Sequence, residues 1–166
     1  MRKAGASVLF VLFMALLQGC YSFRGTAVPA HCKTIAIPVF EDRSGAGVAA
    51  FRAELTKALV NRVESQSALL VIPSVARADL LLEGVIISFS DAPGQLSSMT
   101  ERAVKNRITL VVQVTVAERA KKVPVFTHSF VGFAEYPVGN YAAQQEAIRF
   151  SLNQIIDDIF DRLISG

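Results

Sequence analysis

The sequence contains few of the side chains on which catalytic and metal sites depend. Of its 166 residues, only two are cysteines and two are histidines. It has no His-Glu-x-x-His, no paired Cys-x-x-Cys, no glycine-rich phosphate loop and no Gly-x-Ser-x-Gly. His128 lies within a strand-like pattern, which indicates a packed or surface residue. These absences argue against an enzyme, and we expect no catalytic residue, no cofactor and no metal site.

The chain also lacks a strong excess of charge of one sign. Its formal net charge is +3, and Arg2 and Lys3 supply two of its 17 basic residues. Without those two, 15 basic residues stand against 14 acidic ones. Because no global basic character remains, the composition does not favour nucleic acid as a partner.

The N-terminus carries a different signal. Two positive charges precede an uncharged apolar run over residues 8–17, as in the first two regions of a secretory signal. A membrane-spanning helix needs roughly 20 apolar residues, so this run is too short to be one. The following tetrapeptide, Leu17-Gln18-Gly19-Cys20, resembles the lipobox of bacterial lipoproteins. That resemblance implies cleavage before Cys20 and acylation of Cys20; an ordinary cleaved signal is the alternative.

These features divide the chain into three parts. We expect a lipoprotein signal peptide over residues 1–19, a lipidated tether over residues 20–31 and a single α/β sandwich domain over residues 32–166. Removing 19 of the 166 residues leaves 147, which suits one domain with its own core. Tyr21 follows the lipidated residue, which by resemblance to proteobacterial lipoprotein sorting favours the periplasmic side of the outer membrane.

Lipidation of Cys20 would leave Cys32 without an intramolecular partner. We expect Cys32 to be a small buried residue at the start of a strand. A reactive thiol or an intermolecular bridge is the alternative.

Hydrophobic periodicity predicts seven elements in the order β-α-β-β-β-β-α. The expected strands cover residues 33–40, 69–72, 79–89, 107–116 and 125–133, and the expected helices cover residues 48–65 and 140 to the C-terminus. Pro38 places the first strand at an edge or ends it early. The second helix begins with the good N-cap residue Asn140 and buries a stripe that runs from Tyr141 through Leu152.

This order predicts an α+β fold of a single domain, with a mixed and mostly antiparallel β-sheet and two helices on one face. The first strand–helix–strand unit predicts two parallel strands. The opposite face of the sheet carries Val111, Val131 and Phe133, so it is a candidate docking surface. Residues 90–106 read as a long polar loop, and residues 119–122 as a hairpin turn.

Three segments of the chain resemble a known family. Residues 19–23 (Gly-Cys-Tyr-Ser-Phe), 33–43 (Lys-Thr-Ile-Ala-Ile-Pro-Val-Phe-Glu-Asp-Arg) and 78–84 (Ala-Asp-Leu-Leu-Leu-Glu-Gly) resemble the lipopolysaccharide-assembly lipoproteins of the LptE type. The resemblance implies a non-enzymatic protein that plugs an outer-membrane β-barrel translocon in a one-to-one complex. Such a protein helps the barrel assemble and helps deliver lipopolysaccharide to the outer leaflet.

Lipopolysaccharide carries phosphates, which exposed Arg and Lys side chains bind through charge-assisted hydrogen bonds. Two clusters of candidate phosphate contacts follow from this chemistry: Arg102, Lys105 and Arg107 at the end of the long loop, and Arg119, Lys121 and Lys122 in the hairpin turn. Strand direction predicts the long loop at the tether end and the hairpin turn at the far end, too far apart for one site. Ordinary solvated loop charges are the alternative for each cluster.

Two functions therefore remain for the sequence. The first is the barrel partner in lipopolysaccharide export, and the second is an accessory or pore-forming lipoprotein of another outer-membrane export system. The two differ in stoichiometry, because a plug pairs with one barrel whereas a pore former assembles rings of itself.

Overall fold

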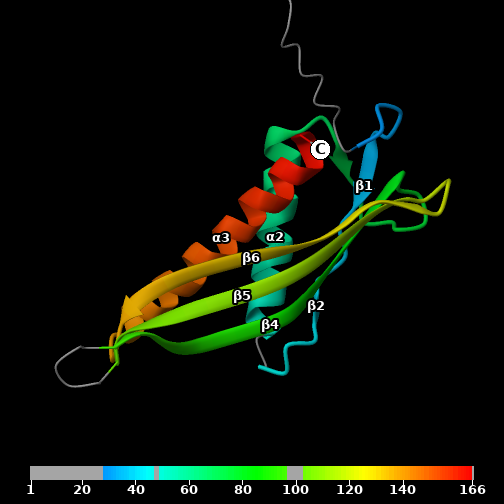
Figure 1. Cartoon of the computed structure of the whole chain (residues 1–166). Helices are drawn as coiled ribbons and strands as arrows, with labels where there is room; N and C mark the ends of the chain where they lie inside the picture. Colours follow the sequence, from blue (N-terminus) through cyan, green and yellow to red (C-terminus); the bar gives the residue numbers. More distant parts are fainter. Residues whose placement is uncertain (1–27, 47–48, 97–102, 166) are drawn as a thin grey trace, which may run out of the picture.

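The computed structural model describes residues 28–46, 49–96 and 103–165. The expected signal peptide, Cys20 and most of the tether lie outside these residues. The elements are β1 (Thr34–Ala36), β2 (Glu41–Asp42), α2 (Ala49–Gln66), β3 (Leu70–Val71), β4 (Leu80–Leu96), β5 (Ala103–Glu118), β6 (Val123–Pro137) and α3 (Tyr141–Ser165). They form one sheet in the order β3-β1-β4-β5-β6, with β2 beside β4. Both helices cover the same face (Figure 1), so the predicted α+β fold is confirmed.

The first strand–helix–strand unit is parallel, as predicted, because β1 pairs with β3 in parallel register. The expected strand over residues 33–40, however, ends at Ala36. The backbone of Phe40 is bonded to α2 instead of the sheet: its N–H donates to Thr56 Oγ1 at 3.1 Å, and its carbonyl accepts from Arg52 Nε at 2.6 Å. The chain rejoins the sheet only at β2, which pairs with β4 in parallel register.

The hairpin of β4 and β5 is longer than predicted. The expected polar loop over residues 90–106 is wrong, since Ser90 pairs with Thr109, and the ladder continues past Asp91 and Ala92 to Leu96 opposite Ala103. Polar side chains pair here because backbone hydrogen bonds extend the ladder beyond the apolar core. Residues 97–102 of that segment are not among the described residues.

Helix α3 begins as predicted, with the N–H of Ala143 donating to Asn140 Oδ1 at 3.0 Å. Its buried stripe includes Leu152, Ile155 and Ile159. Tyr141 does not belong to that stripe: it is 74% exposed, because it occupies the first helical position at the end of the sheet. The short strand β3 is likewise less buried than expected, with Leu70 exposed at the sheet edge.

The core lies between the two helices and the sheet face that they cover. Its strand residues alternate along β5 as predicted; Ile108, Leu110, Val112, Val114 and Val116 are all buried. Helix α3 approaches β6 closely at Gly132, where an added Cβ would overlap the backbone oxygen of Ser151. Among the described residues, no helix has both the length and the apolar character needed to cross a bilayer.

Candidate interaction surface

The two predicted basic clusters lie at opposite ends of the sheet, as expected, but their ends are exchanged. The hairpin-turn cluster lies at the end predicted for the long-loop cluster, and the described residues of the long-loop cluster lie at the end predicted for the hairpin turn. Strand β4 begins beside β1, where Ile35 pairs with Leu80, and Leu80 also pairs with Glu118 of β5. The turn after Glu118 is therefore at the end where the N-terminal segment enters the sheet, which we call the tether end. The end of β4 and the start of β5, where Leu96 pairs with Ala103, lie at the opposite end of the sheet, the far end (Figure 1). The parallel pairing of β1 with β4 decides this arrangement.

The hairpin turn at the tether end contains three of the predicted basic residues. The guanidinium of Arg119 donates to the carbonyl of Val75. The ammonium of Lys121 lies 3.1 Å from Glu118 Oε2. Lys122 is exposed and has a positive φ of 54°, which closes the turn. Two of the three cations are therefore already engaged by groups of the protein itself.

At the far end, Lys105 and Arg107 project from β5, and Arg102 lies outside the described residues. Both described cations face Glu135 on β6, at 3.9 Å from Lys105 and 2.7 Å from Arg107. The hydrogen bond from Arg107 lowers the pKa of the Glu135 carboxyl. All three side chains are partly exposed, so the pairs are accessible to an anion that competes for the cations.

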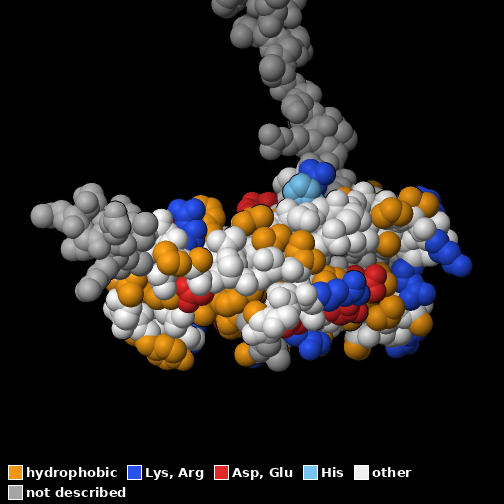
Figure 2. Space-filling model, turned by 60° about the horizontal axis from the view of Figure 1, so that its bottom comes forward, with side chains coloured by type: hydrophobic (Ala, Val, Ile, Leu, Met, Phe, Trp, Pro, Cys, Tyr) orange, Lys and Arg blue, Asp and Glu red, His pale blue; other side chains and the backbone are white. Residues whose placement is uncertain are grey.

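Apolar side chains accompany the cations on the helix-free face of the sheet. The Arg107 guanidinium stacks 5.4 Å from the centre of the Phe133 ring, and Phe133 is half exposed. Val131 is also about half exposed and pairs across the ladder with Val111. Figure 2 shows such hydrophobic patches between charged side chains on the surface that it presents. The helix-free face therefore carries exposed apolar side chains together with charged ones.

A groove of about 510 Å³ runs between the outer edge of β6 and α3. Its apolar lining includes Phe133, Ala143 and the exposed ring of Phe150. Gln154 closes one side of it by accepting the N–H of Phe133 at 2.9 Å. Sequence reasoning missed this groove. Phe150 falls outside the apolar stripe of α3, and an aromatic residue off the buried stripe was the one available signal.

A buried tyrosine holds the far end of the sheet to α3. The Tyr136 hydroxyl donates to Asp91 Oδ2 at 2.6 Å, and Gln144 donates to the same oxygen at 2.6 Å. Asn106 also donates to the Tyr136 oxygen. Burial and the Asp91 carboxylate both raise the pKa of Tyr136. The network links β4, β5, β6 and α3 at this end of the sheet, beside the groove and the cations.

The fold and this surface define a class: a small α+β domain with one helix-covered face and one helix-free face. The family model for lipopolysaccharide assembly, of the LptE type, matches residues 32–163. The chain therefore belongs to the LptE-type lipopolysaccharide-assembly lipoproteins. No curated protein is significantly similar to it in sequence.

Solved structures share the fold at low sequence identity. A hypothetical protein from Chlamydia trachomatis is 13% identical, with a TM-score of 0.55, over 81% of this chain and 99% of that one. A protein from Xanthomonas campestris is 13% identical, with a TM-score of 0.56, over 78% and 81%. The PelC dodecamer from Paraburkholderia phytofirmans is 12% identical, with a TM-score of 0.54, over 86% and 96%. At such identities the likeness concerns the fold alone.

Proposed function

We propose that this protein is an outer-membrane lipoprotein that plugs and helps assemble the β-barrel translocon for lipopolysaccharide. The observation that carries the proposal is the family match, which spans nearly the whole described domain. The domain is a scaffold for binding, and we place its partners on its helix-free sheet face and its far end.

The helix-free face is the surface that we assign to the barrel. The interior of a large outer-membrane barrel is polar and hydrated, so a fully apolar face would be poorly matched to it. Here Thr109 and Gln113 alternate with Val111 on β5, and Ser129 and Val131 share this face on β6. Such a face offers hydrogen-bonding groups together with a few apolar contacts, which suits a plug that lies against a barrel wall.

The far end is the surface that we assign to lipopolysaccharide. The ligand combines phosphates with acyl chains, and Arg107, which shares Glu135 with Lys105, lies next to the exposed ring of Phe133. The groove between β6 and α3 begins at the same ring. A phosphate of the ligand would replace the Glu135 carboxylate as the partner of Lys105 and Arg107, and it would bring two negative charges instead of one. The cations of the tether-end cluster (Arg119, Lys121 and Lys122) are engaged in a similar way, by Glu118 and the Val75 carbonyl. The exposed ring of Phe133 and the groove beside it are what favour the far end.

The anchor of the protein is Cys20, with acyl chains on its sulfur and on the new amino terminus. Two or more chains make attachment stable, because each buried methylene contributes about 0.8 kcal/mol. A Cys20→Ala variant is therefore expected to leave the membrane fraction. Its persistence in the outer membrane after a high-salt wash would contradict lipidation as the anchor.

The test of the function is capture of the native acylated protein after detergent extraction of outer membranes. We expect one large β-barrel protein to co-purify in equimolar amount. A matched pair of variants then maps the interface: Val131→Asp on the helix-free face should lose the barrel, whereas Asn153→Asp on the exposed side of α3 should keep it. Recovery of the chain alone would contradict the plug function.

The alternative is a lipoprotein that assembles with itself in another export system. The same fold occurs in a protein whose solved structure is a dodecamer, so this outcome has a structural precedent. Mass measurement of the captured complex separates the two functions, since rings of this chain without a barrel would support the alternative.

A further inference from the structure

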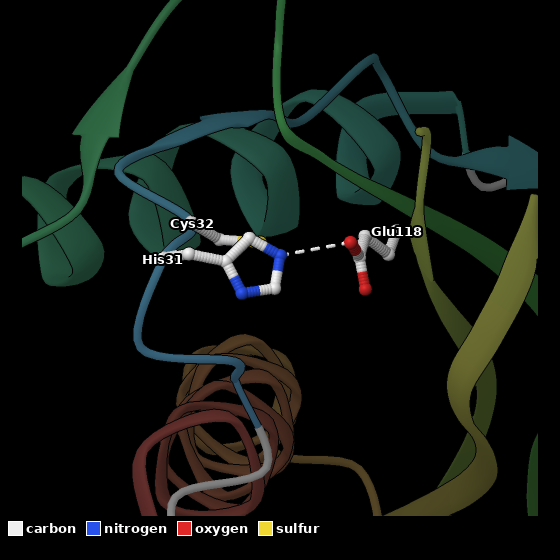
Figure 3. A group of neighbouring side chains, drawn as sticks. All are labelled: His31, Cys32 and Glu118. Carbon is white, nitrogen blue, oxygen red and sulfur yellow. Dashed lines mark hydrogen bonds and ion pairs between the residues drawn. The ribbon is translucent and has the colours of Figure 1, made fainter. Parts of the chain in front are cut away.

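The tether end brings together three side chains that are the common ligands of transition metals. His31 and Cys32 lie on the segment that enters the sheet, and Glu118 is the last residue of β5, 87 positions further along the chain from His31. Figure 3 shows the imidazole and the thiol converging on the Glu118 carboxylate. One ligand atom from each residue lies within 4.8 Å of the other two. Among the described residues, this is the one such group of three.

The donor set and its spacing fit one ion better than others. A nitrogen, a thiolate and a carboxylate oxygen are the ligands of Zn²⁺, and a tetrahedral site with these bond lengths separates its ligand atoms by about 3.3–3.7 Å. The Nε2 atom of His31 is 2.8 Å from Glu118 Oε1, so this pair has to open by less than an ångström. The Cys32 sulfur, which lies within 4.8 Å of both atoms, has to close by no more than about 1.5 Å. Harder cations such as Mg²⁺ would not select a thiol.

The surroundings favour a cation and keep the site in place. Cys32 is buried, and the Glu118 side chain is only 8% exposed, whereas that of His31 is 60% exposed and can move. The carboxylates of Glu118 and Asp79 both lie near enough to Cys32 to act on its charge, and two negative charges beside the thiol attract a dication. Lys121 can remain on Glu118 Oε2 while Oε1 binds the metal, which holds the carboxylate in orientation.

We propose that His31, Cys32 and Glu118 form a Zn²⁺ site with a water molecule as the fourth ligand. This site goes beyond the proposed role in lipopolysaccharide assembly and does not depend on it. Its structural effect is to fasten the segment that follows the lipid anchor to the end of β5. A bound ion would thus add a coordinate link where the protein otherwise has the His31–Glu118 hydrogen bond.

The test is a Co²⁺ titration of the mature protein in detergent, after chelator treatment and under reducing conditions. One equivalent of Co²⁺ should produce the visible bands of a tetrahedral site and the ultraviolet charge-transfer band of a thiolate ligand, and Zn²⁺ should abolish both. Cys32→Ser should lose the charge-transfer band. His31→Gln, an exposed and therefore tolerated substitution, should weaken binding at least about tenfold, as loss of even an outer-shell partner does.

The matched control is His128→Gln, which removes the other histidine from the exposed edge of β6 and should leave the titration unchanged. Zn²⁺ should also raise the melting temperature of the wild type but not that of Cys32→Ser. The proposal is overturned if the folded wild type shows no thiolate band, if Cys32→Ser retains that band, or if His31→Gln binds Co²⁺ as tightly as the wild type.

Discussion

The two faces of the sheet use the same strands for different purposes. On the helix-covered face, β5 and β6 present Leu110, Val112 and Phe130 to the core, and all three are buried. On the opposite face the same strands present Thr109, Val131 and Phe133, which remain at least partly exposed. One register thus separates the residues that stabilise the fold from those available to a partner. The strict alternation of side chains along a strand makes this separation possible.

A charge on the covered face should have the most severe consequence. In Leu152→Asp a carboxylate would enter the fully buried stripe of α3, and we expect the free energy of unfolding to fall by about 4 kcal/mol or more. Chemical denaturation measures the loss. Asn153→Asp places the same charge on the exposed side of the same helix and should change stability by no more than about 0.5 kcal/mol. Equal losses in the two variants would remove the distinction between buried and open surfaces.

Close helix packing on the covered face should also be sensitive to a single methyl group. Gly132→Ala would push against the backbone oxygen of Ser151, which cannot move away as a flexible side chain could. We expect a loss of about 1–3 kcal/mol, the usual cost of overpacking, in urea unfolding. Ser129→Ala, at an exposed position of the same strand, should cost much less.

Substitutions on the open face should separate stability from binding. Val131→Asp replaces a half-exposed residue, so its unfolding free energy should stay within about 0.5–1 kcal/mol of the wild type. The same variant should reduce recovery of the barrel in the capture experiment. A large stability loss without any loss of the barrel would mean that this face serves the fold.

Stability at low pH should depend more on Asp79, which is hydrogen-bonded to the backbone at the start of β1, than on Glu135 on the helix-free face. Hydrogen bonds from the N–H groups of Lys33 and Thr34, and from the Thr34 hydroxyl, lower the pKa of Asp79. A group whose pKa is lowered by folding stabilises the protein above its unfolded-state pKa, 3.8 for Asp79, and that contribution is lost as the pH falls through the folded value.

We therefore expect Asp79→Asn to flatten the decline of stability below that pH. Glu135, whose pKa is lowered mainly by Arg107 on the open face, should matter less, because exposed ion pairs contribute little. Glu135→Gln is the companion variant, and its acid unfolding curve should stay close to that of the wild type. If Glu135→Gln changed the acid unfolding curve more than Asp79→Asn did, Glu135 and not Asp79 would be the carboxylate that stabilises the fold.

Local patterns predicted much of the fold. The alternation of Ile108, Leu110 and Val112 identified β5 and its buried face, and the spacing of Leu152, Ile155 and Ile159 identified the buried stripe of α3. Asn140 marked the start of that helix correctly. These features depend on neighbours three or four positions away at most, so the chain carries them without knowledge of long-range pairing.

The errors arose where distant segments decide the structure. Phe40 left the sheet because Thr56 and Arg52 of α2 bind its backbone. The polar residues after Phe89 belong to β4 because residues of β5 pair with them across the sheet. Phe150 became part of a groove because β6 lies opposite it. None of these contacts leaves a periodic signal in the residues concerned.

The residues alone therefore establish the element order, the buried stripes and the resemblance that the family match confirms. Strand pairing establishes which groups meet. It places the turn of Lys121 at the tether end, leaves Lys105 and Arg107 at the far end, and sets Glu118 beside His31 and Cys32. Periodicity is a property of short segments, whereas the meeting of residues 87 positions apart depends on the register and direction of strands that are joined only when the sheet forms.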